Sequence, residues 1–191
     1  MKKLWPLLLA PLVAFADPPA SLPSSEETEG APRHYGNLRV GASSATQNNR
    51  PELCLEVAPL SYLSVESCGT GSGFLHQDPA PELAHFRTKL KVAELKLGKV
   101  WVQPQLLAGF AELQIGEDAP GFNFRGVGAN GVSTAGAEAG ASLRTLFPSK
   151  GGVEFVTEVS AAAAWLPHAE QLSLPQNKVQ PSLSISFGVG F

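Results

Sequence analysis

Residues 179–191, VQPSLSISFGVGF, alternate between apolar side chains and polar or small ones. Successive side chains of a β-strand point to opposite faces of the sheet, so this period of two predicts a strand with one apolar and one polar face. The apolar face consists of Val179, Pro181, Leu183, Ile185, Phe187, Val189 and Phe191. A soluble sandwich usually adds a few polar residues after its last strand, so an apolar face that reaches Phe191 needs another reason.

The same alternation occurs in seven earlier stretches of the chain. They are residues 38–42, 53–58, 62–66, 86–92, 100–110, 135–145 and 153–165. The parity changes at Ala93-Glu94, which predicts a β-bulge. The Ala-rich piece from Ser160 to Leu166 could form a short helix by propensity instead of the end of a strand. Apart from this alternative, the chain is predicted to be all-β with eight strands.

The connections between these stretches alternate in length. Tight turns are expected near 58–61, near Gly98 and at Pro148–Gly152, whereas the intervening connections are longer: 45–50, 69–84, 116–132 and 166–177. An up-and-down antiparallel barrel with turns at one end and loops at the other produces this pattern, as transmembrane β-barrels do. A Greek-key sandwich has no reason to alternate in this way.

The polar faces of the expected strands carry a balanced set of charges. In a soluble barrel such a face meets water, whereas in a membrane barrel it faces the interior, and periodicity alone does not distinguish the two. An eight-stranded barrel has just enough interior for side chains, so the charges could form a paired network that closes the lumen. The alternative is an ordinary solvated surface. The residues are Arg39, Arg87, Lys89, Lys91 and Arg144 with Glu56, Glu66, Glu138, Glu154 and Glu158.

Four other residues bear on the membrane interpretation. Trp101 and Trp165 lie near strand ends on what we expect to be the outer face, where aromatic residues of a membrane interface belong. Pro104 and Pro181 argue against a closed barrel, because each lacks one ladder hydrogen bond, although both lie near strand starts.

The first 35 residues differ in composition from the rest. Lys2 and Lys3 precede an apolar run that ends in Ala14-Phe15-Ala16, so residues 1–16 are predicted to be a cleaved secretory signal peptide. This run is too short for a transmembrane helix and is interrupted by prolines. Residues 17–35 are rich in Pro, Ser and Glu and are expected to be a disordered tail.

Composition excludes some functions. Only 16% of the 191 residues are charged, against roughly 25% in ordinary soluble domains. Without Lys2 and Lys3 the chain has 12 basic and 17 acidic residues. No basic cluster of the kind that binds a nucleic acid is visible beyond the short stretch Arg87-Thr88-Lys89-Leu90-Lys91, so a nucleic acid is not an expected partner.

Taken together, the signal peptide, the eight strands over residues 36–191 and the terminal Phe191 resemble the small OmpA/OmpX-like outer-membrane barrels of Gram-negative bacteria. The resemblance is architectural. It implies a monomeric eight-stranded transmembrane β-barrel in the outer membrane, with lipid around it, both termini in the periplasm (residues 17–35 as a periplasmic tail) and four loops outside. It also implies that the C-terminal strand is the signal read by the barrel-assembly machinery, here Leu183, Ile185, Phe187, Val189 and Phe191.

The two cysteines are predicted to form a disulfide. Around the turn near 58–61, residues whose numbers sum to about 122 face each other, and Cys54 and Cys68 satisfy this sum. An oxidising cell envelope preserves such a bond. Metal binding by these cysteines is not expected, because no histidine or second cysteine pair has suitable spacing.

No motif in the chain predicts catalysis or a cofactor. Residues 126–131 match GxGxxG, but a strand pattern follows instead of the helix that a dinucleotide site requires. The four histidines are scattered, and neither His85 nor His168 has the His-x-Ser-Asn context of outer-membrane lipid A deacylases.

We therefore expect a non-enzymatic outer-membrane protein with a structural, adhesion or surface-interaction role carried by loops 69–84 and 116–132. Two alternatives remain open: a secreted soluble barrel that binds a small apolar ligand inside, and an outer-membrane lipid-modifying enzyme.

Overall fold

The computed structural model describes residues 35–46, 50–71, 80–116, 122–149 and 152–191. These residues form an all-β structure with one short 3-10 helix, η2, at Ala169–Gln171. No helix in the described ranges is long and apolar enough to cross a membrane. The strands are β1 (Gly36–Ser43), β2 (Glu52–Leu60), β3 (Leu63–Gly69), β4 (Glu82–Lys91), β5 (Leu95–Leu97), β6 (Val100–Gln114), β7 (Ser133–Pro148), β8 (Glu154–Trp165) and β9 (Val179–Gly190).

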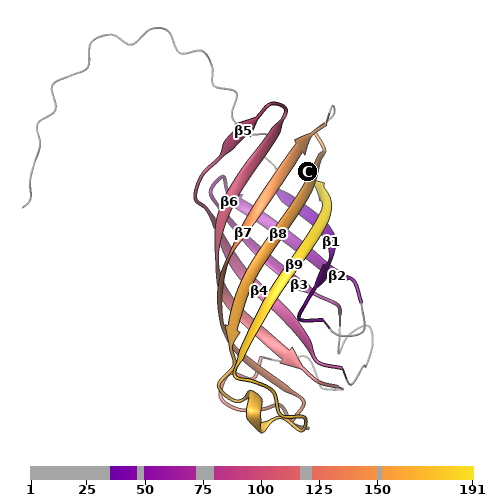
Figure 1. Ribbon diagram of the computed structural model, residues 1–191, viewed down its shortest axis with the longest axis vertical. Coiled ribbons are helices and arrows are strands. Elements are labelled where there is room, and N and C mark those ends of the chain that lie inside the picture. Colours follow the sequence, from indigo (N-terminus) through magenta and orange to yellow (C-terminus); the bar gives the residue numbers. More distant parts are fainter. Residues whose placement is uncertain (1–34, 47–49, 72–79, 117–121, 150–151) are drawn as a thin grey trace, which may run out of the picture. The chain divides into compact units, whose positions relative to one another are not determined.

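The sheet closes into an eight-stranded antiparallel barrel (Figure 1). Strands pair in chain order, except that β4 and β5 both pair with β6. The circle is completed by β1 and β9, with Asn37 opposite Gly190 and Ser43 opposite Ser184. The predicted all-β, eight-stranded antiparallel barrel and the predicted alternation of short turns and longer connections are both confirmed. Residues 160–165 belong to strand β8, so the helical alternative for this piece is wrong.

The ninth strand, β5, continues the wall begun by β4 after a bulge. Lys91 pairs with Gln105 and Leu95 pairs with Val102, so four steps along β4–β5 oppose three along β6. One extra residue between two strand segments is the definition of a bulge, which confirms the parity change predicted at Ala93-Glu94.

Both prolines lie where the neighbouring ladder is incomplete. Pro104 in β6 lies opposite the gap between Lys91 and Leu95. Pro181 in β9 pairs with Ala163 of β8, but its other side lies beyond the last β1 pair, Ser43 with Ser184. A closed barrel therefore accommodates both prolines, because each lacks a paired residue on one side and needs no backbone N–H donor there.

The outer face of the barrel is apolar and the inner face is polar. Exposed large hydrophobic side chains recur at outward positions of the strands, among them Leu38, Val40, Leu53, Leu55, Val57, Val65, Leu90, Leu106, Leu143, Phe155, Val159, Trp165, Leu183, Ile185 and Phe187. The inner positions between them are buried and largely charged or hydroxyl-bearing. Close approach of neighbouring strands favours glycine at some inner positions: a Cβ on Gly109 of β6 would lie 2.0 Å from the carbonyl oxygen of Phe86 in β4.

The expectation for the two tryptophans is half wrong. Trp165 is 58% exposed on the outer face, as expected. Trp101 is 8% exposed and packs inside with Leu146 and Val156, because it has the parity of the inner residues Gln103 and Gln105. Its ring also lies 5.1 Å from the Lys96 ammonium.

Apolar side chains close both ends of the barrel interior. At the turn end, near Gly98, the cluster is Trp101, Leu146 and Val156. At the loop end, a larger cluster includes residues of the β8–β9 connection that carries η2; it consists of Leu83, Ala111, Leu113, Ile115, Ala164, Leu166, Ala169 and Leu172. The buried ion pairs described below lie between these two apolar layers.

The predicted signal peptide, residues 1–16, and nearly all of the predicted tail, residues 17–34, lie outside the described residues.

Candidate functional site

The centre of the barrel interior is a network of buried ion pairs. Arg39 of β1 is bonded to Glu66 of β3, to Glu56 of β2 at 3.1 Å and to Glu158 of β8 at 2.8 Å. Its Nε also donates to the Asn37 side chain at 2.7 Å. Arg39 is 1% exposed, so its charge is balanced by carboxylates of strands β2, β3 and β8 instead of by water.

Two further cations share the same carboxylates. Lys89 of β4 contacts Glu56 at 3.1 Å and also Glu66 and Glu158. Arg144 of β7 is bonded to Glu56, and its guanidinium donates to Glu158 at 2.8 and 3.0 Å. Three cations therefore surround three carboxylates, and the contacts join six strands across the lumen: β1, β2, β3, β4, β7 and β8.

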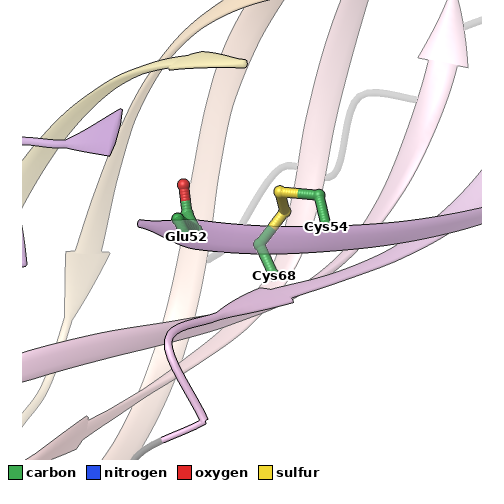
Figure 2. Close-up of side chains that lie close together, drawn as sticks. All are labelled: Glu52, Cys54 and Cys68. Atoms are coloured by element: carbon green, nitrogen blue, oxygen red, sulfur yellow. A yellow bond between two sulfur atoms is a disulfide. The ribbon is translucent and has the colours of Figure 1, made fainter. Parts of the chain in front are cut away.

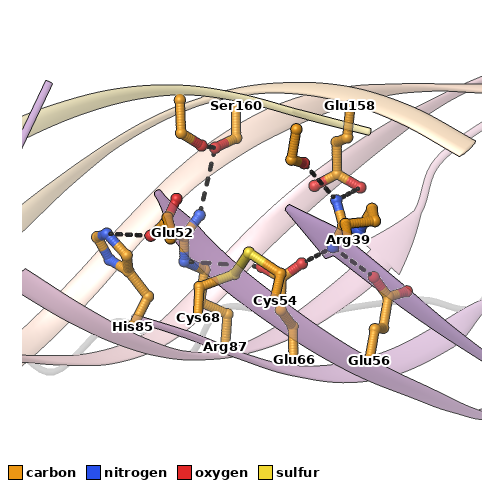
Figure 3. The surroundings of a disulfide bond; sticks show 12 residues. Arg39, Glu52, Cys54, Glu56, Glu66, Cys68, His85, Arg87, Glu158 and Ser160 are labelled. Atoms are coloured by element: carbon orange, nitrogen blue, oxygen red, sulfur yellow. Dashed lines mark hydrogen bonds and ion pairs between the residues drawn. A yellow bond between two sulfur atoms is a disulfide. The ribbon is translucent and has the colours of Figure 1, made fainter. Parts of the chain in front are cut away.

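The network extends toward the loop end through Arg87 (Figure 3). Arg87 Nε lies 3.2 Å from Glu138 of β7 and 4.0 Å from Glu66. Glu138 in turn contacts His85 Nδ1 at 2.8 Å, and the other ring nitrogen of His85 lies 3.6 Å from Glu52. His85 is completely buried, so it cannot meet a substrate outside the barrel.

The disulfide between Cys54 and Cys68 is present, as predicted (Figure 2). The two residues are direct partners in the β2–β3 ladder, with Cα atoms 4.1 Å apart. The bond projects into the interior beside Glu52, at the end of the hairpin away from its Ser61-Tyr62 turn. It fixes the position of the strands that present Glu56 and Glu66 to the network.

The structure places eight of the ten predicted lumen charges in one connected cluster. They are Arg39, Arg87, Lys89 and Arg144 with Glu56, Glu66, Glu138 and Glu158, four charges of each sign. Lys91 does not join it. Its ammonium pairs instead with Glu94 beyond the end of β4, where both side chains are partly exposed, because the bulge brings Glu94 beside it. Glu154 is buried at the start of β8, one pair further toward the turn end than Val156.

Among the residues that the structure describes, two groups of side chains have the donor types of a metal site. Glu52 lies beside Cys54 and Cys68, and Glu56, Glu66 and Glu158 lie beside one another. The first group lacks free thiolates because its cysteines are bonded together. In the second, the carboxylates already bind Arg39, Lys89 and Arg144. The disulfide and the ion pairs therefore account for the closeness of the side chains in both groups.

An aromatic cluster lies outside the barrel wall at the loop end. Phe86 of β4 and Phe110 of β6 stack with ring centroids 5.1 Å apart. Phe122 and Phe124 of the β6–β7 connection pack on them at 4.7 to 5.3 Å. This connection contains residues 126–131, where Gly128 and Gly131 form a turn, and it leads into strand β7 without a helix, as expected for a loop.

The five residues of the expected assembly signal lie on the outer face of β9. Leu183, Ile185, Phe187, Val189 and Phe191 are all exposed. The N–H of Phe191 also donates to the Gly36 carbonyl oxygen at 3.0 Å, which ties this strand to the start of β1. Of the two loops expected to carry surface interactions, residues 72–79 and 117–121 lie outside the described residues.

Comparison with protein-family models, with curated proteins and with solved structures returned no match.

Two buried residues of the interior, His85 and Glu52, were not among the predicted lumen residues. His85 has the parity of Arg87 and Lys89, and Glu52 has the parity of Cys54 and Glu56, so their inner positions were visible in the pattern. The aromatic cluster had no such signal, because Phe122 and Phe124 lie in a connection without periodicity.

Proposed function

We propose that this chain is a non-enzymatic outer-membrane β-barrel protein of the cell envelope, exported by a cleaved signal peptide. In this proposal both ends of the barrel chain and the tight turns face the periplasm, and the longer connections face outward. The protein acts as a closed, monomeric structural element whose outer connections make contacts at the cell surface.

The observation that carries the proposal is the reversal of the two faces. The outer wall exposes large apolar side chains on many strands, for example Leu106, Ile185 and Phe187. The interior contains buried ion pairs instead. Soluble monomers rarely expose contiguous apolar patches larger than a few hundred Å². A lipid environment removes this cost, and closure of the sheet satisfies the backbone groups that lipid cannot.

The interior also bears on the alternative of a soluble barrel that binds an apolar ligand. Such a barrel needs an apolar cavity, but the centre of this lumen contains Arg39, Lys89 and Arg144 with their carboxylates. An apolar ligand would have to displace these ion pairs. The membrane proposal is therefore the better supported of the two.

A charge placed on the outer wall tests the proposal. Leu106 is 53% exposed in the middle of β6, and Leu174 is 52% exposed in the β8–β9 connection. Arginine facing lipid at the bilayer midplane costs about 2–4 kcal/mol, whereas arginine on a surface in water costs almost nothing. We expect Leu106→Arg to lower the stability of the folded barrel and Leu174→Arg to leave it unchanged.

The measurement combines fractionation with unfolding. The full chain and both variants are expressed in a Gram-negative host, fractionated, and unfolded with urea in lipid vesicles, with folding followed by the change in gel mobility on boiling. The wild type is expected in the outer-membrane fraction. Recovery in the soluble periplasmic fraction without detergent, or equal stability of Leu106→Arg and wild type, would show the proposal to be wrong.

A further inference from the structure

The aromatic cluster at the loop end joins the β6–β7 connection to the outer wall of the barrel. The rings of Phe86 and Phe110 belong to the outer wall, and those of Phe122 and Phe124 come from the β6–β7 connection. This connection therefore lies against the outside of the barrel over β4, β6 and β7. Wall residues beneath it, such as Ala135, are fully buried although they face outward.

Hydrogen bonds fix this part of the connection to the start of β7. The N–H of Ala135 donates to the Asn123 carbonyl oxygen at 3.0 Å, and the Asn123 side chain donates to the Ser133 hydroxyl at 2.9 Å. The Thr134 hydroxyl donates to the Gly126 carbonyl oxygen at 2.9 Å. These hydrogen bonds hold residues 122–126 in one position. A ligand that binds there does not have to order the segment first, so binding loses less conformational entropy.

The outer surface of this segment combines apolar rings with a cation. Phe122 is 45% exposed and Phe124 is 47% exposed, although each contacts other rings. Arg125, between Phe124 and Gly126, is exposed and has no ion pair with the described residues. All three line a hollow of about 430 Å³ together with Asn123, Gly126 and Val127.

We propose that this hollow binds a phosphorylated, multiply acylated glycolipid of the outer leaflet. Arg125 pairs with a phosphate of the headgroup, and Phe122 and Phe124 contact the upper parts of its acyl chains. This inference rests on the proposed function, because the loop end meets the outer leaflet only if the barrel spans the outer membrane in the proposed orientation.

Three observations favour a lipid as the occupant. The rings are continuous with the apolar wall through Phe86 and Phe110, so a bound acyl chain runs from the hollow onto the wall without crossing a polar surface. Arginine recognises phosphate through two parallel hydrogen bonds, and its weak hydration suits the membrane interface. Aromatic residues beside the headgroups are also the usual anchors of a barrel at the membrane surface.

Lipid titration of the folded protein tests the site. The full chain is expressed in a Gram-negative host, purified folded in a mild detergent, and titrated with diphosphoryl lipid A while native mass spectrometry counts the bound lipid. We expect one lipid A per chain. Arg125→Gln and the double variant Phe122→Ser/Phe124→Ser should each weaken this binding about tenfold.

A cation at the opposite end of the barrel provides the matched control. Lys99 is exposed in the turn that follows β5, so Lys99→Gln removes the same charge far from the hollow and should leave lipid A binding unchanged. Each variant is first shown to be folded by its gel shift on boiling. The proposal is overturned if Arg125→Gln binds lipid A as the wild type does. It is also overturned if phosphatidylglycerol competes as well as lipid A itself.

Failure of this inference and failure of the proposed function give different results. If the hollow does not bind lipid A, the chain still fractionates with the outer membrane and Leu106→Arg still lowers its stability. If the protein is not a membrane barrel, it is recovered without detergent whatever the titration shows.

Discussion

The charged side chains inside the barrel are stable only as a set. Moving a carboxylate or a guanidinium out of water costs several kcal/mol even after relaxation, and each must recover this cost from partners of opposite sign. Here Glu56, Glu66 and Glu158 each contact more than one cation. Glu56, for example, contacts Arg39, Lys89 and Arg144. Removing one member leaves its partners buried with less compensation.

Arg144 provides the test at this scale. Arg144→Met keeps much of the side-chain volume but removes the charge that binds Glu56 and Glu158. We expect the free energy of unfolding, measured with urea in lipid vesicles, to fall by about 3 kcal/mol. Lys91→Met is the control: the Lys91 and Glu94 side chains are 22% and 23% exposed, so its loss should cost no more than about 1 kcal/mol.

A second substitution separates charge balance from packing. Adding Glu158→Gln to Arg144→Met restores equal numbers of positive and negative charges in the cluster, so the double variant should be more stable than the sum of the two single effects predicts. Strict additivity of the two losses would contradict a coupled network.

Among the strands, the β2–β3 hairpin has a covalent constraint in addition to its ladder. The disulfide joins residues 14 positions apart, and both cysteines are buried. A cross-link of this length lowers the entropy of the unfolded chain and stabilises a protein by about 3 kcal/mol in the chain-entropy view. It also holds the ends of β2 and β3 in register where a long connection leaves the hairpin.

Replacing both cysteines by alanine measures this contribution. Cys54→Ala/Cys68→Ala should still insert and show the gel shift on boiling, but should unfold at lower urea, with a loss of about 3 kcal/mol. Thiol alkylation of the exported wild type under denaturing, non-reducing conditions should find no free thiol. Two alkylated thiols would mean that the bond does not form in the cell.

Strand faces could be predicted from the sequence far better than the connections could. The period of two placed Arg39, Glu66 and Arg144 on one face of their strands, and residue numbering around one turn gave the Cys54–Cys68 pair. Parity also assigns Trp101 to the interior, but the expectation followed residue type and placed it outside. The contacts of Phe122 and Phe124 could not be predicted, because a connection has no repeating pattern to show what it packs against.

At the scale of the whole molecule, the described residues place three layers of contacts inside the barrel. The apolar layer of Trp101, Leu146 and Val156 closes the turn end, the ion pairs occupy the centre, and the cluster around Leu113 and Leu166 closes the loop end. A permeating ion would have to break several buried ion pairs and cross two apolar layers. We therefore expect the barrel to be closed to ions.

Planar-bilayer recording tests this closure. The folded wild-type protein should insert without producing steady single-channel conductance, because buried ion pairs and two apolar clusters lie inside a narrow eight-stranded barrel. Arg144→Met retains both apolar layers and should also remain closed. Regular conductance steps from the wild type would show that the interior opens.

The pairing of β1 with β9 closes the sheet into a ring in which every strand of the wall has an antiparallel neighbour on both sides. The N–H of Phe191 already bonds to Gly36, so a short linker from residue 191 to residue 36 would add one more tight turn at the end where the others lie. The ladder then contains no strand that must be first. In such a circular chain, new termini opened at another turn would leave every strand neighbour, and every charge inside, where it is now.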